Sequence, residues 1–346
     1  MASILVTGWT WFIGSHTVVR LLEEGHDVVI VDNGSNSSPD LIDTLFTLTW
    51  KKIPFYPYDI RDTDRIMCVF AAHPCDAVIH FAALKAVGES CENPFLYYSN
   101  NILGTISLLQ CMEAYGVSTL LFSSSCTVYD TVHGKPPFDE QSPLWNTTNP
   151  YGTSKFVMEA LLRDLALYKG FSCIALRYFN PIGAHPSGLL GENPTGTPTN
   201  IFPLLLQAAA GERASITVFG GDYATSDGSC IRDYIHIMDI AQGHCLALDY
   251  LLDAKAHNRS IGFDAFNLGT WTGTSVFTLI DAVERWTQKS IPYTIGPRRP
   301  GDAPISVANP QKAQQHLQRT AKYTVDDAVT DGRRFYTRRH VANTLY

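Results

Sequence analysis

Short runs of apolar, largely β-branched residues alternate with helix-length segments through the first half of the chain, and this alternation most limits the possible folds. The runs are Ile4 to Val6, Val28 to Val31, Pro54 to Tyr58, Ala77 to Ile79, Thr119 to Ser123 and Cys173 to Leu176. Continuous apolar strands separated by helices predict a parallel sheet that is covered on both faces, because the crossover connections between parallel strands bury the sheet. We therefore expect an α/β fold with a doubly wound parallel sheet.

The texture of the sequence changes near Phe179, where loops rich in glycine and proline begin and clean strand patterns become fewer. We expect a Rossmann-type domain over residues 1–178 and a smaller α/β substrate-binding lobe over residues 179–346, with the chain free to cross between them. Open α/β sheets bind ligands at the carboxyl ends of their strands, so the second lobe is expected to lie over that edge.

Composition excludes several classes of function. The 346 residues are 45% hydrophobic and 17% charged, which is ordinary for a folded protein. The net charge of -7, without a basic stripe, predicts no nucleic-acid partner and no attraction to an anionic membrane. No apolar run reaches membrane-spanning length, and the first strand pattern starts almost at Met1 and leaves no room for a leader. We expect a cytoplasmic protein.

The eight cysteines are scattered, without a C-x-x-C pair and without a Cys/His cluster at metal-ligand spacing. We therefore expect free thiols and no metal site.

The turn after the first predicted strand has part of the pattern of a dinucleotide-binding loop. Such a loop uses one glycine for its tight turn, one for the approach of the backbone to a pyrophosphate, and one for packing of the following helix. Gly8 and Gly14 stand in the first and third places, and Trp11 stands in the middle place. Asp32 closes the second strand, where a carboxylate can hold the ribose hydroxyls of an adenosine. By itself this pattern indicates the fold better than it indicates the cofactor.

The second motif is Tyr151-Gly-Thr-Ser-Lys155, which follows the serine run Ser123 to Ser125 at the end of a predicted strand. A Tyr-x-x-x-Lys spacing places a phenol and an ammonium one turn apart on a helix. The cation then favours the phenolate and is expected to bring the pKa of the tyrosine, usually near 10, toward neutrality. The motif predicts a general base.

With these motifs in place, the chain resembles the UDP-glucose 4-epimerases, which are extended short-chain dehydrogenases/reductases. The resemblance rests on motifs that recur in family order over nearly the whole chain: Leu5 to Gly8, His80 to Ser90, Phe122 to Ser125 with Thr127 to Tyr129, Asn149 to Lys155, Arg177 to Pro181 and Arg232 to His236. It implies an isomerase of galactose metabolism that interconverts UDP-glucose and UDP-galactose through a 4-keto sugar, with NAD as cofactor, a UDP-sugar as substrate and a homodimer as the assembly.

The resemblance also implies roles for individual residues. The catalytic set is Ser125, Tyr151 and Lys155. The residues expected around NAD are Gly8, Trp11, Phe12, Ile13, Gly14, Asp32, Asn33, Asp59, Ile60, Phe81, Ala82, Ala83, Lys85, Asn101 and Tyr178. Those expected around the UDP-sugar are Asn180, Asn200, Phe219, Arg232, Arg299, Asp302 and Ser306. Ser306 stands where the family often has a larger residue, so either extra room for an N-acetylated sugar or local packing accounts for it.

Trp9 and Trp11 replace small residues of the family's cofactor loop, and this leaves two hypotheses open. A packed tryptophan buries on the order of 200 Å². If the rings lie away from the cofactor, the chain is an ordinary NAD-dependent epimerase. If they fill the pyrophosphate space, NAD is absent, and the chain is a divergent member: a cofactor-free isomerase, lyase or cyclase of a secondary-metabolite pathway, or a non-catalytic sugar-nucleotide sensor.

Overall fold

The structure is a computed structural model of the chain. It describes residues 1–9, 12–35, 41–193, 198–299 and 301–343, and the side chains among them up to residue 339.

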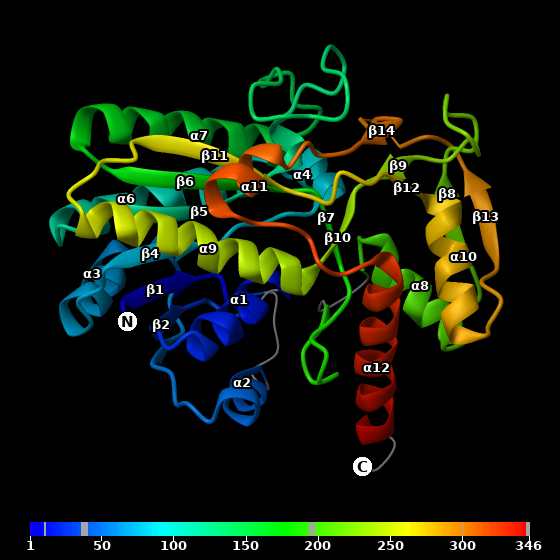
Figure 1. Ribbon diagram of the computed structural model, residues 1–346, viewed down its shortest axis with the longest axis horizontal. Helices are drawn as coiled ribbons and strands as arrows, with labels where there is room; N and C mark the ends of the chain where they lie inside the picture. The colour runs from blue at the N-terminus through cyan, green and yellow to red at the C-terminus, as the bar shows by residue number, and fades with distance from the viewer. Residues whose placement is uncertain (10–11, 36–40, 194–197, 300, 344–346) are drawn as a thin grey trace.

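A seven-stranded parallel sheet forms the centre of the molecule, as the alternating pattern predicts (Figure 1). Its strand order is β11-β6-β5-β4-β1-β2-β3. The chain adds strands outward from β1 on one side and then from β4 on the other, so the order switches between β1 and β4, as in a doubly wound fold. The strands are β1 (Ser3–Thr7), β2 (Asp27–Val31), β3 (Phe55–Tyr56), β4 (Ala77–His80), β5 (Thr119–Ser125), β6 (Ser172–Tyr178) and β11 (Phe263–Leu268).

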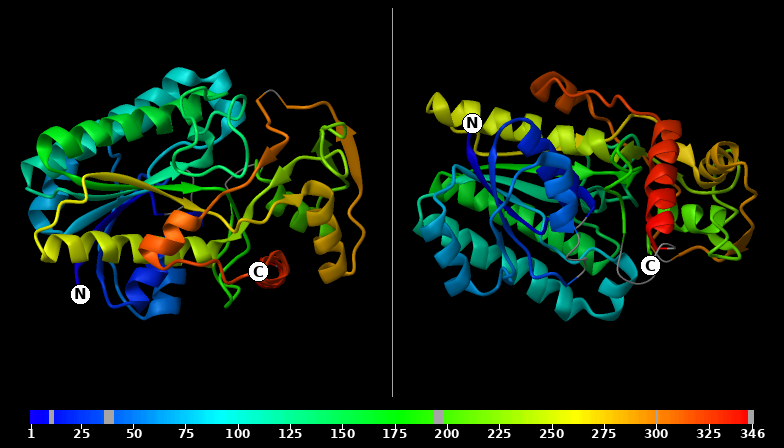
Figure 2. Two further views of the ribbon diagram at one scale, coloured as in Figure 1. Left: turned by 45° about the horizontal axis from the view of Figure 1, so that its top comes forward. Right: turned by 90° about the horizontal axis from the view of Figure 1, so that it is seen from below.

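Helices cover both faces of this sheet, so its apolar strands are buried on each side (Figure 2). The core on one face receives side chains from α1 (Phe12–Glu23), α2 (Leu41–Thr49), α9 (Ile237–Ala256) and α11 (Gln311–Leu317). The core on the other face receives side chains from α3 (Thr63–Ala72), α6 (Gly104–Ala114) and α7 (Pro150–Lys169). Three shorter segments, α4 (Val87–Glu92), α5 (Pro94–Tyr97) and the π-helical turn η1 (Tyr98–Leu103), lead into α6.

The chain crosses between the two halves more than once. The chain leaves the large sheet after β6 and returns to it with α9, which packs on α1. Strand β11 then joins the sheet beside β6, with Leu268 opposite Tyr178. The sequence pattern did not indicate β11, which lies well beyond the run of alternating strands and helices. The domain boundary at residues 178 and 179 therefore stays a prediction, and the seventh strand of the large sheet comes from the second half of the sequence.

The remaining elements form a smaller α/β part beside the carboxyl edge of the sheet, at the right of Figure 1. Its strands are the pair β7 (Asn180–Ile182) and β10 (Tyr234–His236), the pair β8 (Ile216–Phe219) and β13 (Tyr293–Gly296), and the set β9 (Ile231–Arg232), β12 (Thr274–Ser275) and β14 (Ile305–Ser306). Its helices α8 (Ile201–Ala209), α10 (Val276–Thr287) and α12 (Val325–Asn343) contribute to a separate apolar core.

Trp9 lies inside the protein and not in a ligand site. Its side chain is fully buried in the core on the α1 face of the sheet, and its ring meets Phe55 edge to face at 6.3 Å. The hypothesis that the Trp9 ring fills the pyrophosphate space is wrong, because the ring is enclosed in this core, where its Nε1 has no hydrogen-bond partner among the described residues. The matching hypothesis for Trp11 falls outside the described residues.

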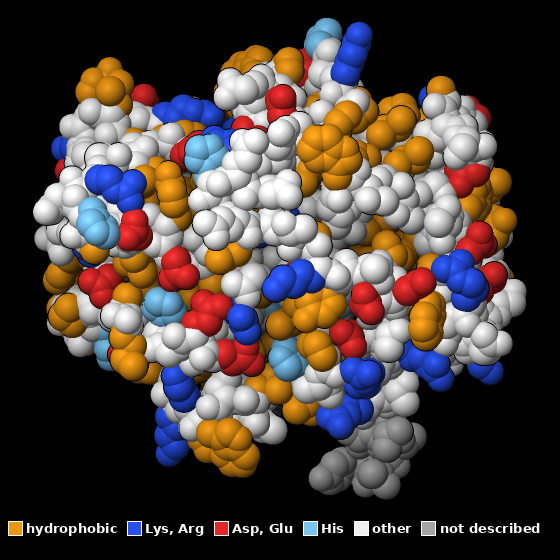
Figure 3. Space-filling view, in the orientation of Figure 1, with side chains coloured by type: hydrophobic (Ala, Val, Ile, Leu, Met, Phe, Trp, Pro, Cys, Tyr) orange, Lys and Arg blue, Asp and Glu red, His pale blue; other side chains and the backbone are white. Residues whose placement is uncertain are grey.

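The exclusions made from composition stay predictions, and the structure describes the helices, thiols and surface on which they bear. Within the described ranges, no helix is long and apolar enough to cross a membrane, and no cluster of His, Cys, Asp or Glu could hold a metal ion. All eight cysteines are free. On the face shown in Figure 3, acidic and basic side chains are interspersed.

We expect Trp9→Ala to lower the free energy of unfolding by about 3 to 5 kcal/mol, because the substitution empties a filled volume in the core. Urea unfolding followed by circular dichroism measures this. Trp50→Ala is the control, since Trp50 is 79% exposed, and it should change the stability by less than about 0.5 kcal/mol. Equal stability of the two variants would contradict the burial of Trp9.

Candidate active site

Helix α7 places the tyrosine and the lysine of the second motif. Asn149 caps the helix, because its side-chain oxygen accepts a hydrogen bond from the Gly152 amide at 2.9 Å, and Pro150 occupies the first turn. Tyr151 and Lys155 therefore lie in the first two turns, on the side that faces the end of β5. The Lys155 Nζ donates a hydrogen bond to the Ser123 carbonyl at 2.6 Å and lies 5.9 Å from the centre of the Tyr151 ring.

Tyr151 is hydrogen-bonded to Ser125, so the structure brings the three proposed catalytic residues together. The Ser125 Oγ also accepts hydrogen bonds from the backbone amide and the hydroxyl of Thr127, at 3.2 and 3.0 Å. These two donors leave the Ser125 hydroxyl hydrogen for an acceptor in the site. The Ser125 hydroxyl is therefore oriented by Thr127, which lies just after the end of β5.

Burial changes the acid–base properties of this cluster in a way that the motif alone does not predict. Burial raises the pKa of Tyr151 to about 12, although the bond from Ser125 lowers it. Burial also lowers the pKa of Lys155 to about 7, against the attraction of the Glu159 carboxylate. The expected fall of the tyrosine pKa toward neutrality is thus wrong for the protein by itself, because removal from water opposes ionisation of both groups.

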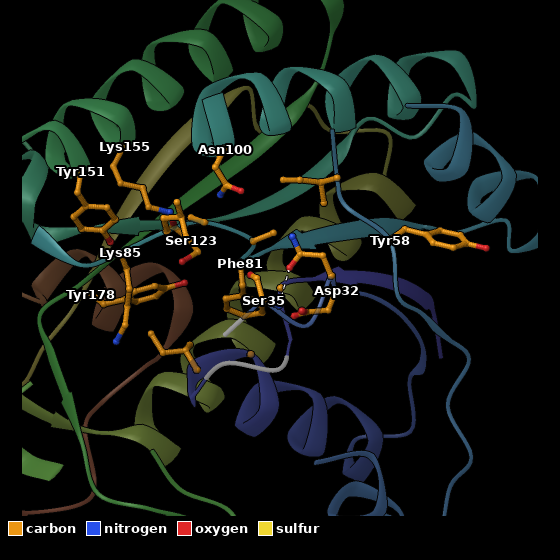
Figure 4. A pocket seen from close by; sticks show the side chains of 18 residues that line it. Asp32, Ser35, Tyr58, Phe81, Lys85, Asn100, Ser123, Tyr151, Lys155 and Tyr178 are labelled. Carbon is orange, nitrogen blue, oxygen red and sulfur yellow. Dashed lines mark hydrogen bonds between the residues drawn. The ribbon is translucent and has the colours of Figure 1, made fainter. Parts of the chain in front are cut away.

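The first cleft follows the carboxyl ends of the strands (Figure 4). Tyr151, Lys155, Tyr178 and Lys85 gather at one end, and Asp32 and Ser35 lie farther along it. Of the residues expected around a cofactor, those that line this cleft are Gly8, Ile13, Gly14, Asp32, Asn33, Ile60, Phe81, Ala82, Ala83, Lys85 and Tyr178.

The two glycines of the turn allow a close backbone approach that a side chain would prevent. A Cβ on Gly8, which has a φ of +74°, would lie 2.3 Å from the backbone nitrogen of Ala82, and a Cβ on Gly14 would lie 2.7 Å from the Cα of Trp9. The turn therefore packs tightly against the end of β4 and delivers the start of α1 to the cleft, where free amides attract an anion. The turn, the Asp32 carboxylate and the long cleft fit a dinucleotide.

Three expected cofactor residues lie outside the lining. Phe12 is buried with its ring against His16, and Asp59 forms an ion pair with Arg61 at 2.7 Å. Asn101 is fully buried. Its side-chain oxygen accepts a hydrogen bond from the Leu84 backbone N–H, and its side-chain nitrogen donates one to the Leu84 carbonyl. Its neighbour Asn100 lines the cleft instead. Trp11 is outside the described residues.

Side chains that the sequence did not single out complete the first cleft. Ser35, Tyr58, Leu84, Asn100 and Ser123 line it as well. Ser123 was visible in the serine run, but its contribution to Lys155 is a backbone carbonyl, which no side-chain motif signals.

The second cleft, of about 880 Å³, lies in the smaller part of the molecule and collects six of the seven residues expected around a UDP-sugar. They are Asn180, Asn200, Phe219, Arg232, Arg299 and Asp302. One carboxylate joins the two arginines: Asp302 lies 3.4 Å from the Arg232 guanidinium and 3.0 Å from that of Arg299. Two such forks suit a diphosphate.

Two further features of the second cleft point to a polar ligand. The side-chain oxygen of Asn180 is buried and has no hydrogen-bond partner among the described residues. The Arg299 guanidinium lies over the ring of Phe219 at 4.9 Å, and that ring is 39% exposed. An exposed aromatic face beside an arginine can stack on a nucleobase.

The carboxylate of Glu192 connects the two clefts. Its Oε1 accepts a hydrogen bond from Asn200 at 2.6 Å and lies 3.6 Å from the Lys85 Nζ. Lys85 lines the first cleft and Asn200 the second. Burial raises the pKa of Glu192 and lowers that of Lys85. Sequence reasoning missed Glu192, because a lone glutamate in a glycine-rich loop gives no signal.

Ser306, the seventh residue, lies in β14 beside Arg232 of β9. Its side chain and that of Ser125 both bond the Cys126 thiol, whose pKa burial raises to about 11. The small residue thus sits close to the serine of the catalytic set. Its effect on sugar choice stays a prediction.

Comparison with known families places the chain among proteins with this architecture. Residues 4–269 match the model of the NAD dependent epimerase/dehydratase family. The chain is 46% identical over 334 residues to a UDP-glucose 4-epimerase of Bacillus subtilis, covering 96% of each protein. It is 47% identical over 335 residues to the bifunctional protein GAL10 of Pachysolen tannophilus, but it spans only 48% of that longer relative.

A solved structure extends the likeness to three dimensions. The UDP-glucose 4-epimerase of Bifidobacterium longum, in complex with NAD+ and UDP, superposes with a TM-score of 0.92 at 43% sequence identity, over 97% of this chain and 98% of the other. The chain therefore belongs to the NAD dependent epimerase/dehydratase family, and its relatives there are UDP-glucose 4-epimerases.

Proposed function

We propose that the protein catalyses the interconversion of UDP-glucose and UDP-galactose at carbon 4, with NAD held in the first cleft and the UDP part of the substrate in the second. The observation that carries the proposal is the cluster of Ser125, Tyr151 and Lys155 at one end of a cleft with Asp32 farther along it. The Bifidobacterium longum relative, solved with NAD+ and UDP, supports the same division.

The residues of the first cleft fit NAD. The turn from Gly8 and the start of α1 would hold the pyrophosphate, Asp32 the adenosine ribose, and Lys155 the nicotinamide ribose. When bound, NAD supplies the acceptor for a hydride from the sugar carbon. The alternative without NAD required tryptophan rings in this space, and the burial of Trp9 in the core argues against it.

Tyr151 and Ser125 handle the proton of the sugar hydroxyl. Burial favours the protonated Tyr151 phenol in the protein by itself, so the base is the phenolate that forms beside charged Lys155. That phenolate would accept the proton of the 4-hydroxyl and return it when the 4-keto sugar is reduced on its other face. The charged form of Lys155 favours the phenolate, and Ser125 holds the reacting oxygen and the phenol in line. Proton and hydride both return, so no net oxidation occurs.

The second cleft anchors the substrate while its sugar turns over. Arg232 and Arg299 would hold the diphosphate through charge-assisted hydrogen bonds, and Phe219 would stack on the uracil. Neither arginine belongs to the reacting cluster. The groups that bind the diphosphate and the groups that react are therefore separate. The diphosphate can stay bound while the sugar presents either face to the reacting groups.

We expect freshly purified protein to release NAD on acid treatment and to convert UDP-galactose to UDP-glucose. Tyr151→Phe should lower kcat by about 100-fold or more, because a general acid and base is lost, and should leave the binding of UDP intact. The matched control is Tyr58→Phe, another tyrosine of the same cleft, which should stay near wild type. Full activity of Tyr151→Phe, or wild-type protein without NAD and without activity, would overturn the proposal.

Calorimetry tests the second cleft separately. UDP should bind, and Arg299→Ala should weaken the dissociation constant by about tenfold or more through the loss of a charged donor. Arg298→Ala is the control: Arg298 pairs with Asp222 at 2.8 Å and stacks on Tyr223. If both variants bind UDP equally, Arg299 does not hold the diphosphate.

We further propose that the active form is a homodimer in which η1 and α6 pack, together with α7, against the same elements of a second copy. Apolar side chains on η1 and α7, and on α5 just before η1, face solvent in the single chain. The exposed fractions are 87% for Phe95 on α5, 55% for Leu103 on η1 and 72% for Leu167 on α7. Water disfavours such groups when they gather on neighbouring helices.

Sedimentation velocity should give about twice the mass of the 38.3 kDa chain. Phe95→Glu with Leu103→Glu should give a monomer, because two charges would be buried without partners. Val132→Glu, at a residue that is 65% exposed and outside these helices, should leave the mass unchanged. A wild-type monomer at micromolar concentration contradicts the assembly.

A further inference from the structure

Glu159 is a buried carboxylate on α7 that the proposed chemistry does not use. It follows Lys155 by one helical turn, as Lys155 follows Tyr151, and its side chain is fully buried. Its Oε1 accepts hydrogen bonds from the Ser124 hydroxyl at 2.6 Å and from the Arg177 Nε at 2.9 Å. Its Oε2 accepts from the Arg177 Nη2 at 2.6 Å and from the Arg163 Nη2 at 3.2 Å. All four of these contacts come from donors, so both side-chain oxygens of Glu159 act as acceptors.

Two of the partners of Glu159 come from neighbouring strands: Ser124 from β5, which also carries Ser125, and Arg177 from β6. In the parallel pair of β5 and β6, Ser124 is the register partner of Arg177, and Ser125 is that of Tyr178. Side chains alternate along a strand, so Ser124 continues the series of Leu120 and Phe122 toward the helices on the α7 face. Ser124 and Arg177 thus reach the same carboxylate.

Three consecutive serines of β5 therefore meet three residues of α7. The Ser125 side chain bonds Tyr151, the Ser123 carbonyl bonds Lys155, and the Ser124 side chain bonds Glu159. Glu159 is the only one of these three partners on α7 that also makes a two-point ion pair, with Arg177 on the neighbouring strand. That pair is locked further, because the Arg177 Nη1 donates to the Tyr129 hydroxyl at 3.1 Å.

We propose that Glu159 is a positioning residue for the reaction: it fixes the end of β5 against α7 through Ser124 and Arg177, and its negative charge keeps the buried Lys155 ammonium protonated. This inference rests on the proposed epimerase function and assigns to that site a charge that lies outside both clefts.

The charges around Lys155 favour this role for Glu159. The titratable and charged groups that face Lys155 or its neighbours are His80 from β4, Lys85 after it, Tyr151 and Glu159 from α7, and Arg177 and Tyr178 from β6. His80 is uncharged near pH 7, since burial lowers its pKa to about 3. Burial lowers the pKa of Lys155 to about 7, and Glu159 is the group that raises it. Among the groups just named, Glu159 is the carboxylate, and the others are neutral or positive.

The sign of the effect follows directly. Glu159→Gln removes the negative charge and leaves the Arg177 guanidinium uncompensated, so Lys155 should lose its proton at lower pH. The decline of kcat on the alkaline side should then move to lower pH by about one unit. The KM for UDP-galactose should stay within about twofold, because the second cleft is untouched.

A direct titration separates this inference from the proposed function. In protein labelled with 13C-lysine, the Cε resonance of Lys155, assigned with Lys155→Met, reports its protonation whether or not the protein has epimerase activity. We expect the Lys155 pKa to fall by about 1 in Glu159→Gln. An inactive wild type would defeat the proposed function alone, whereas an unchanged Lys155 titration in Glu159→Gln would defeat the electrostatic role alone.

Two matched variants separate position from charge. Ser124→Ala removes the bond from β5 and keeps the charge pair, so it should lower kcat about fivefold to tenfold with the alkaline limb unmoved. Glu159→Gln with Arg177→Met removes both charges, and it should return the Lys155 pKa toward the wild-type value even if kcat stays low. This double variant also serves if the single variant, with its unpaired buried arginine, does not fold. Wild-type kcat in Ser124→Ala would overturn the positioning role.

Discussion

The contact between the end of strand β5 and the side of helix α7 determines where chemistry can occur in this protein. The strand delivers three serines at its carboxyl end, and the helix delivers a tyrosine, a lysine and a glutamate at successive turns. Each hydrogen bond across this contact satisfies a group that burial would otherwise penalise. Because the strand is central in the sheet and the helix is capped by Asn149, both sides of the contact are held by structure outside the site. The reacting groups are thus set by the core.

The same contact explains why the two clefts can be built from distant parts of the chain. The first cleft uses the ends of strands in the large sheet, and the second uses short strands of the smaller sheets. Carboxylates hold these parts: Asp302 joins two arginines within the second cleft, and Glu192 joins Lys85 of the first cleft to Asn200 of the second. Buried ion pairs contribute little net stability, since desolvation offsets their attraction, but removing one partner is strongly unfavourable. Their value here is fixed geometry.

The large sheet could be predicted from the sequence because parallel strands buried on both faces are continuously apolar. All six strands expected from that pattern are present. Strand β11 was not predicted. Its sequence places Asp264 and Asn267 among apolar residues, so it lacks the continuous apolar pattern of the other strands, and it lies in a region rich in loops. The choice between Asn100 and Asn101 depends on the π-helical turn, which alters the usual helical spacing. The pKa of Tyr151 also escaped, because the motif gives the neighbouring charge and not the desolvation.

The burial of Trp9 has an optical consequence. Four other tryptophans, Trp50, Trp145, Trp271 and Trp286, are between 43% and 79% exposed, so their fluorescence is emitted from water-contacting rings at longer wavelength. Trp9 is fully enclosed, so we expect its emission at the blue edge of the spectrum. It also adjoins Gly8, whose backbone lines the first cleft. Selective excitation at the red or blue edge therefore distinguishes the core beneath the nucleotide turn from the rest of the surface, and the protein carries its own probe of that turn.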